Sequence, residues 1–223
     1  MIAFNLIKDL RPYNAHVLAY PEIGNTEVVR DEFKTDSGLV FYSKKRTAFT
    51  PVSFTIEFKG TKEEIRKNRN KVSSILEYAK ITFDNEIFYR GRFLGENVET
   101  RYFFQNVTFK GQAIAMLNTQ VNEIPIGETV RIYNNGNLPT PCRIRLEGKT
   151  PYEVRIKGFD DDISVHGLNG EAIIDSEKGL HIANMEDQFN IISFPYITDY
   201  VDILVEGKEG FRCFLEFEGR VLC

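Results

Sequence analysis

The sequence predicts a mainly β protein with one long helix, divided into two domains. Phe and Tyr number 18 and 10 in a chain that is 42% hydrophobic and lacks Trp, and such residues favour sheets. Alternation of polar and apolar residues recurs throughout, whereas a single segment has helical periodicity. Residues 1–120 hold 18 basic and 14 acidic residues (net +4), and residues 121–223 hold 10 and 18 (net −8). This asymmetry indicates a domain of residues 1–120 and another of 121–223.

The first domain begins with strands and then a helix. Strands are expected at Ala15–Tyr20, Leu39–Tyr42 and Pro51–Lys59, where Val52, Phe54, Ile56 and Phe58 share one face. A helix is expected over about residues 61–80. Thr61 and Glu64 fit a capping box, and an apolar stripe at helical spacing follows: Ile65, Val72, Ile75, Leu76 and Ala79. The basic face of this helix could contact nucleic acid, but a solvated surface is the favoured interpretation.

Strands resume at Lys80–Phe83, Ile87–Phe93 and Tyr102–Met116. In the last of these we expect a bulge at Gly111 and a core of Phe104, Val107, Phe109 and Ile114. The polar segment 117–127 is expected to be the domain boundary.

Short strands separated by turns predict an antiparallel β-sandwich for the second domain. The turns are expected at 135–136, 158–162, 169–170, 177–179 and 207–210. In the stretch RIYNNGNLPTPCRIRLEG, Ile144 and Leu146 are expected to point inward, and Arg143 and Arg145 outward. The strands are expected at Thr129–Tyr133, Cys142–Glu147, Glu153–Lys157, Glu171–Asp175, Phe189–Phe194, Val201–Glu206 and Phe211–Phe217.

The sequence indicates no catalytic, metal or cofactor site, so the protein is expected not to be an enzyme. His16, His166 and His181 stand at no recognised ligand spacing, and Asp160–Asp162 is a solvated turn rather than a calcium loop. Cys142 and Cys213 are expected to be packed thiols, with Cys223 a thiol at the chain end, in a protein folded in a reducing cytoplasm. No segment has the length or composition of a membrane span or signal peptide.

The order of several segments resembles a known family. In the first half, PVSFTIEFKGTKEEIRKNRNKVSSIL leads into AKITFDNEIFYRGRF; in the second, NNGNLPTPCRIRLEG is followed by AIIDSEKG, FNIISF and YVDILVEG. Over nearly the full length this order is similar to the distal tail (Dit) proteins of siphophages and prophages of Gram-positive bacteria. One departure is FPYITDY, which stands where the family often has a Pro-Gly turn followed by Asn.

The resemblance implies a structural role. Family members have an N-terminal ring-forming domain, barrel-like or split-barrel in form, and a galectin-like C-terminal sandwich. Six copies form a ring that joins the tube of a long non-contractile tail to the tail tip or baseplate and leaves a channel through which DNA passes without specific binding. The implied partners are other copies of the chain, the tail tube protein, tail-associated lysin, and receptor-binding or baseplate proteins, with no membrane. The implied location is the virion tail tip, after assembly in the host cytoplasm.

The segment 38–49 is a candidate subunit contact, because apolar anchors flank a basic tip. The competing interpretation is an ordinary hairpin with a solvated basic tip. The residues concerned are Phe41, Tyr42, Lys44, Lys45, Arg46 and Phe49.

An alternative function is a carbohydrate-binding adhesin that recognises host cell-wall glycans through the second domain. Its candidate aromatic platforms are Tyr133, Tyr152, Tyr196 and Tyr200. Packing of these rings in a core or interface is the favoured interpretation.

Overall fold

The computed structural model describes residues 3–28, 32–34, 40–42, 48–182 and 189–222. The chain divides into two compact units: an N-terminal unit of Met1–Met116 with Val221–Cys223, and a C-terminal unit of Leu117–Arg220. Within the described ranges, strands dominate both units and a single α-helix is present. The predicted fold class, mainly β with one long helix, is therefore confirmed.

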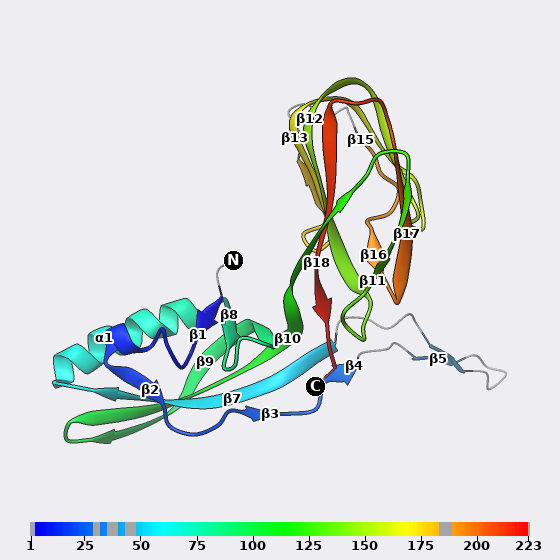
Figure 1. Cartoon of the computed structure of the whole chain (residues 1–223). Coiled ribbons are helices and arrows are strands. Elements are labelled where there is room, and N and C mark those ends of the chain that lie inside the picture. The colour runs from blue at the N-terminus through cyan, green and yellow to red at the C-terminus, as the bar shows by residue number, and fades with distance from the viewer. Residues whose placement is uncertain (1–2, 29–31, 35–39, 43–47, 183–188, 223) are drawn as a thin grey trace. The chain divides into compact units, whose positions relative to one another are not determined.

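The N-terminal unit is one sheet covered on one face by the helix (Figure 1). The main strand order is β1-β8-β9-β10-β7, and β2, β3 and β4 pair with the other edge of β7. Strands β5 and β6 form a separate two-stranded sheet. The elements are β1 (Phe4–Asn5), the 3-10 helix η1 (Arg11–Tyr13), β2 (Ala15–Val17), β3 (Glu22–Ile23), β4 (Glu27–Val28), β5 (Glu32–Lys34), β6 (Val40–Tyr42), β7 (Ala48–Lys59), α1 (Lys62–Leu76), β8 (Ala79–Thr82), β9 (Phe88–Arg101) and β10 (Phe104–Ile124).

Aromatic rings form the centre of the core in the N-terminal unit. The Phe54 ring lies 5.7 to 5.8 Å, centroid to centroid, from the rings of Phe83, Phe93 and Phe109. Val52, Phe54, Ile56 and Phe58 are all buried, which confirms that these alternate residues of β7 share the core face.

Helix α1 begins as predicted and ends earlier than predicted. The Thr61 hydroxyl accepts from the Glu64 backbone N–H, and the Glu64 carboxylate accepts from the Thr61 N–H at 2.9 Å, so the capping box is confirmed. These hydrogen bonds hold the pKa of Glu64 below its usual value. The expected extension to residue 80 is wrong: Ala79–Thr82 is buried on both faces and pairs with β1 and β9. Ala79 is compatible with a helix or a strand, and its pairing with β9 places it in the strand.

Strand β10 differs from its prediction in three respects. Gly111 stays in register opposite Phe93, and the irregularity lies between Thr108 and Phe109. The core face therefore includes Val107, Phe109, Ala113 and Ala115, all buried, whereas Phe104 and Ile114, both predicted there, are half-buried. The strand also continues through Leu117–Ile124, most of the segment taken as a polar boundary.

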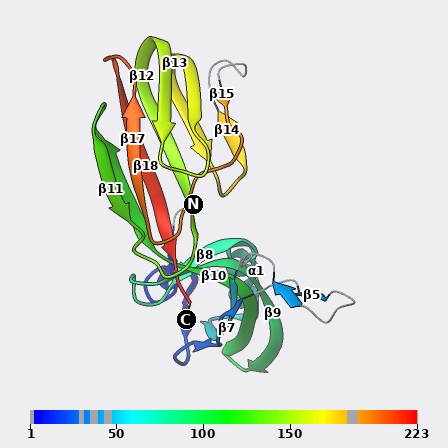
Figure 2. The same cartoon turned by 90° about the vertical axis from the view of Figure 1, so that its right-hand side faces the viewer.

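The C-terminal unit consists of two antiparallel layers that share a long hairpin, β12–β13 (Figure 2). One layer contains residues 117–124 of β10, β18, the first part of β12, the second part of β13, and β14. The other contains β11, β17, the second part of β12, the first part of β13, and β15. The elements are β11 (Thr129–Tyr133), β12 (Thr140–Lys157), β13 (Ile163–Asp175), β14 (Leu180–Ile182), β15 (Phe189–Asn190), β16 (Tyr196–Ile197), β17 (Tyr200–Glu206) and β18 (Phe211–Arg220).

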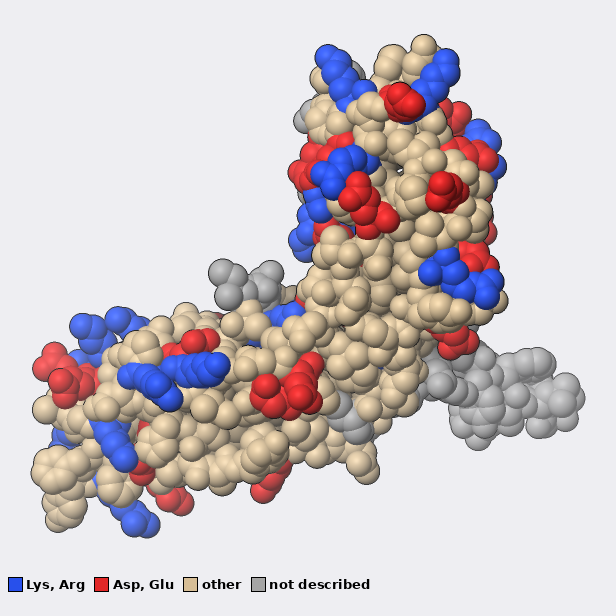
Figure 3. All heavy atoms as spheres, viewed as in Figure 1, with Lys and Arg blue, Asp and Glu red and all other residues tan. Residues whose placement is uncertain are grey.

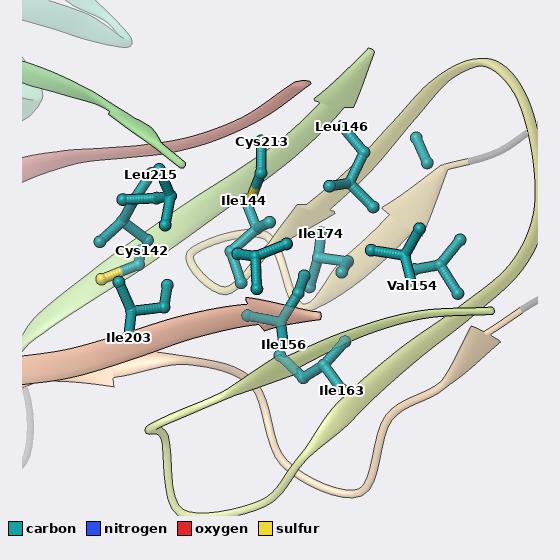
Figure 4. Close-up of a cluster of buried hydrophobic side chains, with 14 of the residues drawn as sticks. Cys142, Ile144, Leu146, Val154, Ile156, Ile163, Ile174, Ile203, Cys213 and Leu215 are labelled. Carbon is teal, nitrogen blue, oxygen red and sulfur yellow. The ribbon is translucent and has the colours of Figure 1, made fainter. Parts of the chain in front are cut away.

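The two layers enclose an aliphatic core (Figure 4). Ile144 and Leu146 are fully buried. Arg143 and Arg145 lie on the other face of β12, where Arg145 Nε is 2.7 Å from Glu216 Oε1. The alternation predicted for this strand is therefore confirmed.

The β12–β13 hairpin bends where the sequence predicts breaks. Strand β12 pairs with β18 up to Gly148 and with β17 from Arg155 onward. Between these two stretches, its register against β13 shifts between Thr150 and Glu153. The two strands predicted here are thus one. The turn predicted at 169–170 is also wrong, because both residues lie within β13 opposite Gly148 and Lys149. A strand that bends this sharply requires residues that otherwise mark turns.

We expect Gly148→Ala to destabilise the fold far more than Gly127→Ala. Both glycines have positive φ, 136° and 81°, but a Cβ on Gly148 would lie 2.3 Å from the Gly210 carbonyl oxygen, whereas a Cβ on Gly127 would meet nothing within 4 Å. The expected costs are about 2–4 kcal/mol for Gly148→Ala and about 1 kcal/mol for Gly127→Ala. Urea denaturation of the full chain measures both, and equal losses would show that the close approach at Gly148 does not constrain the bend.

Two core thiols provide a second test of this packing. Cys142 and Cys213 are free and buried, and burial raises the pKa of each to about 12. A fraction on the order of 10⁻⁴ of each would be thiolate at pH 8, and the thiolate is the reactive form. In a Cys223→Ser variant, which removes the thiol outside the described residues, we expect no reaction with a thiol reagent until denaturant is added. Reaction of either thiol in the native protein at the rate of a free thiol would contradict the burial.

Candidate assembly surfaces

The first candidate surface is the predicted subunit contact in segment 38–49. Phe41 and Tyr42 lie in β6, which pairs with β5 in the registers Phe33↔Phe41 and Glu32↔Tyr42. Lys44, Lys45 and Arg46 lie outside the described residues. In the part of the chain that the structure describes, β5 and β6 pair with no third strand.

Phe49 is not part of this hairpin. It lies in β7, where it pairs with Glu27 of β4, and 41% of its surface is exposed. A large apolar side chain at this exposure is available to a partner but does not by itself identify one. The subunit contact remains a prediction.

The structure brings together two of the four predicted tyrosines. Tyr133 and Tyr200 pair across β11 and β17, with ring centroids 6.2 Å apart. The Arg131 guanidinium lies 4.4 Å from the Tyr200 ring centroid and donates two hydrogen bonds to Asp202, at 2.7 and 2.6 Å. Arg131 thus packs against one ring of the pair, and its hydrogen bonds to Asp202 lower the pKa of that carboxyl.

A groove of about 550 Å³ adjoins Tyr133 between β10 and β11. Its lining combines the exposed Tyr133 and Val121 with the polar side chains of Gln120, Asn122 and Asn135. Aromatic rings beside amide groups are the combination that sugar-binding surfaces use, with the ring as a platform and the amides as hydrogen-bonding groups.

Tyr152 lies elsewhere in the C-terminal unit. The Tyr152 ring has the Lys208 ammonium 3.8 Å from its centroid, beyond the opposite end of β17 from Tyr200. Strand β17 extends from Tyr200 to Glu206, about 20 Å at 3.3 Å per residue, and separates these positions. Tyr196 is half-exposed in β16, which pairs with the start of β12. The four tyrosines therefore do not form one site.

The turn between β9 and β10 is aromatic, and the sequence pattern does not predict it. Tyr102 and Phe103 were expected inside a strand, but they form the turn and expose 95% and 77% of their surfaces. A groove of about 680 Å³ lies between this turn and α1. No Gly or Pro marks the turn in the sequence. Only the length of the apolar and polar alternation, too long for one strand, could have indicated a turn here.

The histidines have ordinary surroundings. His16 Nε2 lies 3.4 Å from Glu57, His166 Nε2 lies 3.9 Å from Glu153, and the His181 ring packs on Phe189. Over the described ranges, no three His, Cys, Asp or Glu residues are grouped so as to hold a metal ion. A search of the same residues finds no helix with the length and hydropathy needed to cross a bilayer.

Comparison with known proteins identifies a shared fold. No protein-family model matches the chain, and no curated protein matches it in sequence. A solved structure does match: the SPP1 Dit (gp 19.1) protein, described as a paradigm of the hub adsorption apparatus in phages that infect Gram-positive bacteria. The match covers 95% of this chain and 96% of that one, with a TM-score of 0.63 and 14% sequence identity. The resemblance to distal tail proteins is thus confirmed at the level of the fold.

Proposed function

We propose that this protein is the hub subunit of a long non-contractile phage tail. Six copies form a ring that joins the tail tube to the tail tip or baseplate and leaves a channel for DNA. The observation that carries this proposal is the match in fold, over nearly the whole of both chains, to a protein described as the hub of a phage adsorption apparatus. The role is structural, without catalysis, and the protein is located at the virion tail tip after assembly in the host cytoplasm.

The β5–β6 hairpin offers a contact through which copies of the chain could join into the proposed ring. A two-stranded hairpin alone is marginally stable in water, and among the described strands these two form a sheet of their own. Pairing with a strand of a neighbouring copy would complete that sheet and satisfy its edge. Such a contact joins different surfaces of adjacent copies, and it closes into a ring when the rotation between copies allows.

The partners of the ring follow from its place in the tail. One face binds the tail tube protein, and the other binds tail-tip proteins, which include the tail-associated lysin and the receptor-binding or baseplate proteins. DNA passes through the ring without specific binding. Residues 1–120, the ring-forming part, carry a net charge of only +4, which is too small an excess to favour a lumen that retains DNA.

The ring is tested by the mass of the purified protein in light scattering, with negative-stain images of the same peak. We expect a hexamer with a central hole. The double substitution Phe41→Ser and Phe49→Ser is expected to give monomers, because it removes the apolar anchors of the predicted contact. Tyr152→Ser, a change of a half-exposed aromatic residue in the C-terminal unit, is the matched control and should leave the ring intact.

Two results would contradict parts of this proposal. Rings that persist in the Phe41, Phe49 variant would exclude that contact and leave the hub role standing. A wild-type protein that stays monomeric at its highest soluble concentration, and that also fails to form rings with tail tube protein, would exclude the ring itself.

The pair of tyrosines beside the β10–β11 groove favours a second candidate function, a carbohydrate-binding adhesin for host cell-wall glycans. We expect any such binding on a glycan array to be lost in a Tyr133→Ala, Tyr200→Ala variant and kept in Tyr152→Ala, since Tyr152 lies apart from the pair. Absence of binding by the wild-type protein to any cell-wall glycan would leave the hub role alone.

A further inference from the structure

The groove between α1 and the β9–β10 turn has an unusual set of side chains. Lys62, Ile65, Arg66 and Arg69 line it from the helix. Their spacing of i, i+3, i+4 and i+7 places them on one helix face. Arg101, the last residue of β9, and Tyr102 of the turn line it from the other side. Four cations therefore surround one recess that also presents the aromatic side chain of Tyr102, whereas Ile65, which lines it too, is buried in the core of the unit.

A hydrogen-bond network holds the two walls of the groove together. Arg69 Nη1 donates to Gln105 Oε1 at 3.1 Å, and Gln105 Nε2 donates to Thr100 Oγ1 at 2.9 Å. The helix and the hairpin are thus linked through side chains at the floor of the groove. A preformed recess loses less conformational entropy on binding than one that must be ordered.

The carboxylates of this region lie off the groove. Basic and acidic side chains both project from the part of the molecule around α1 (Figure 3), but no Asp or Glu is among the described residues that line the recess. Glu64 is committed to the N-cap with Thr61. Glu99 pairs with Asn106 across the hairpin. Because Glu99 is the residue before Thr100, which lines the groove, the side chain of Glu99 lies on the opposite face of the hairpin. The positive charge of the groove is not neutralised from within the groove.

The apolar side chains narrow the choice of ligand. Tyr102 exposes 95% of its surface, and the adjacent Phe103 exposes 77%. An exposed aromatic pair beside a cationic recess matches a ligand with both an apolar group and negative charge.

We infer that this groove is a docking site for an acidic segment of a partner protein, in which an aromatic or aliphatic residue stands among Asp and Glu side chains. The carboxylates pair with Lys62, Arg66 and Arg101, and the apolar residue packs against the exposed ring of Tyr102, beside the small part of Ile65 that the core leaves uncovered. A nucleic acid fits less well, because four cations make a small footprint for a phosphate backbone and the excess of +4 over residues 1–120 is small. The inference does not rest on the tail-hub role.

The test uses a fluorescein-labelled peptide in which one phenylalanine is flanked on both sides by runs of glutamate, and fluorescence anisotropy with the full chain. Arg66→Glu is expected to weaken binding about tenfold or more, because it places a carboxylate in the recess. Lys67→Glu is the matched control: it makes the same change of charge at the next exposed residue, outside the groove. We expect its effect to stay within about threefold, as for a screened surface charge.

Two further measurements separate docking from general attraction. Tyr102→Ala changes a side chain that is almost wholly exposed, so it should weaken binding without affecting the thermal melt. A peptide with glycine in place of phenylalanine should also bind more weakly. Equal losses from Arg66→Glu and Lys67→Glu, or no binding of the peptide at all, would overturn the inference. Displacement of the peptide by a single-stranded oligonucleotide that binds more tightly would overturn it in favour of nucleic acid.

Discussion

The pairing of β12 with two different neighbours is the constraint on which the C-terminal unit depends. Its first part lies beside β18 and its second part beside β17, so one strand belongs to both layers. The bend between them requires the backbone to pass close to Gly210, where any side chain on Gly148 would collide with a carbonyl oxygen. Once the bend is fixed, Ile144 and Ile156 face a common core from different layers, and the remaining strands add to the two edges.

The same bend explains where sequence reasoning succeeded and failed. Strands with one polar and one apolar face were predictable, as β7 and β11 show, because alternation reports burial directly. The continuity of β12 and β13 was not, because Gly148, Pro151 and Asn169-Gly170 are residues that normally end strands. Their role here follows from contacts with distant segments. Helix α1 shows the same limit, since its capping box is local and its end at Leu76 is set by the pairing of β8.

Much less of the candidate surfaces could be predicted than of the fold. The sequence identifies the basic character of α1 but not which cations share a recess, because that depends on the position of the β9–β10 turn. It identifies the tyrosines of the second domain but not that only Tyr133 and Tyr200 meet. The predicted tip at Lys44–Arg46 lies outside the described residues, so its part in assembly stays a prediction.

The two surfaces of the N-terminal unit suit different kinds of association. A hairpin edge offers main-chain hydrogen bonds, which are directional and fix the register of one copy against the next. A basic groove offers charge pairing, which speeds encounter and tolerates variation in the sequence of the ligand. A ring that must close with a defined rotation requires the first property, whereas attachment of a further protein to a completed ring can use the second. If the chain assembles as proposed, the hairpin is buried in the contacts between copies of the ring. The groove between α1 and Tyr102 is then the surface that can bind another protein of the tail.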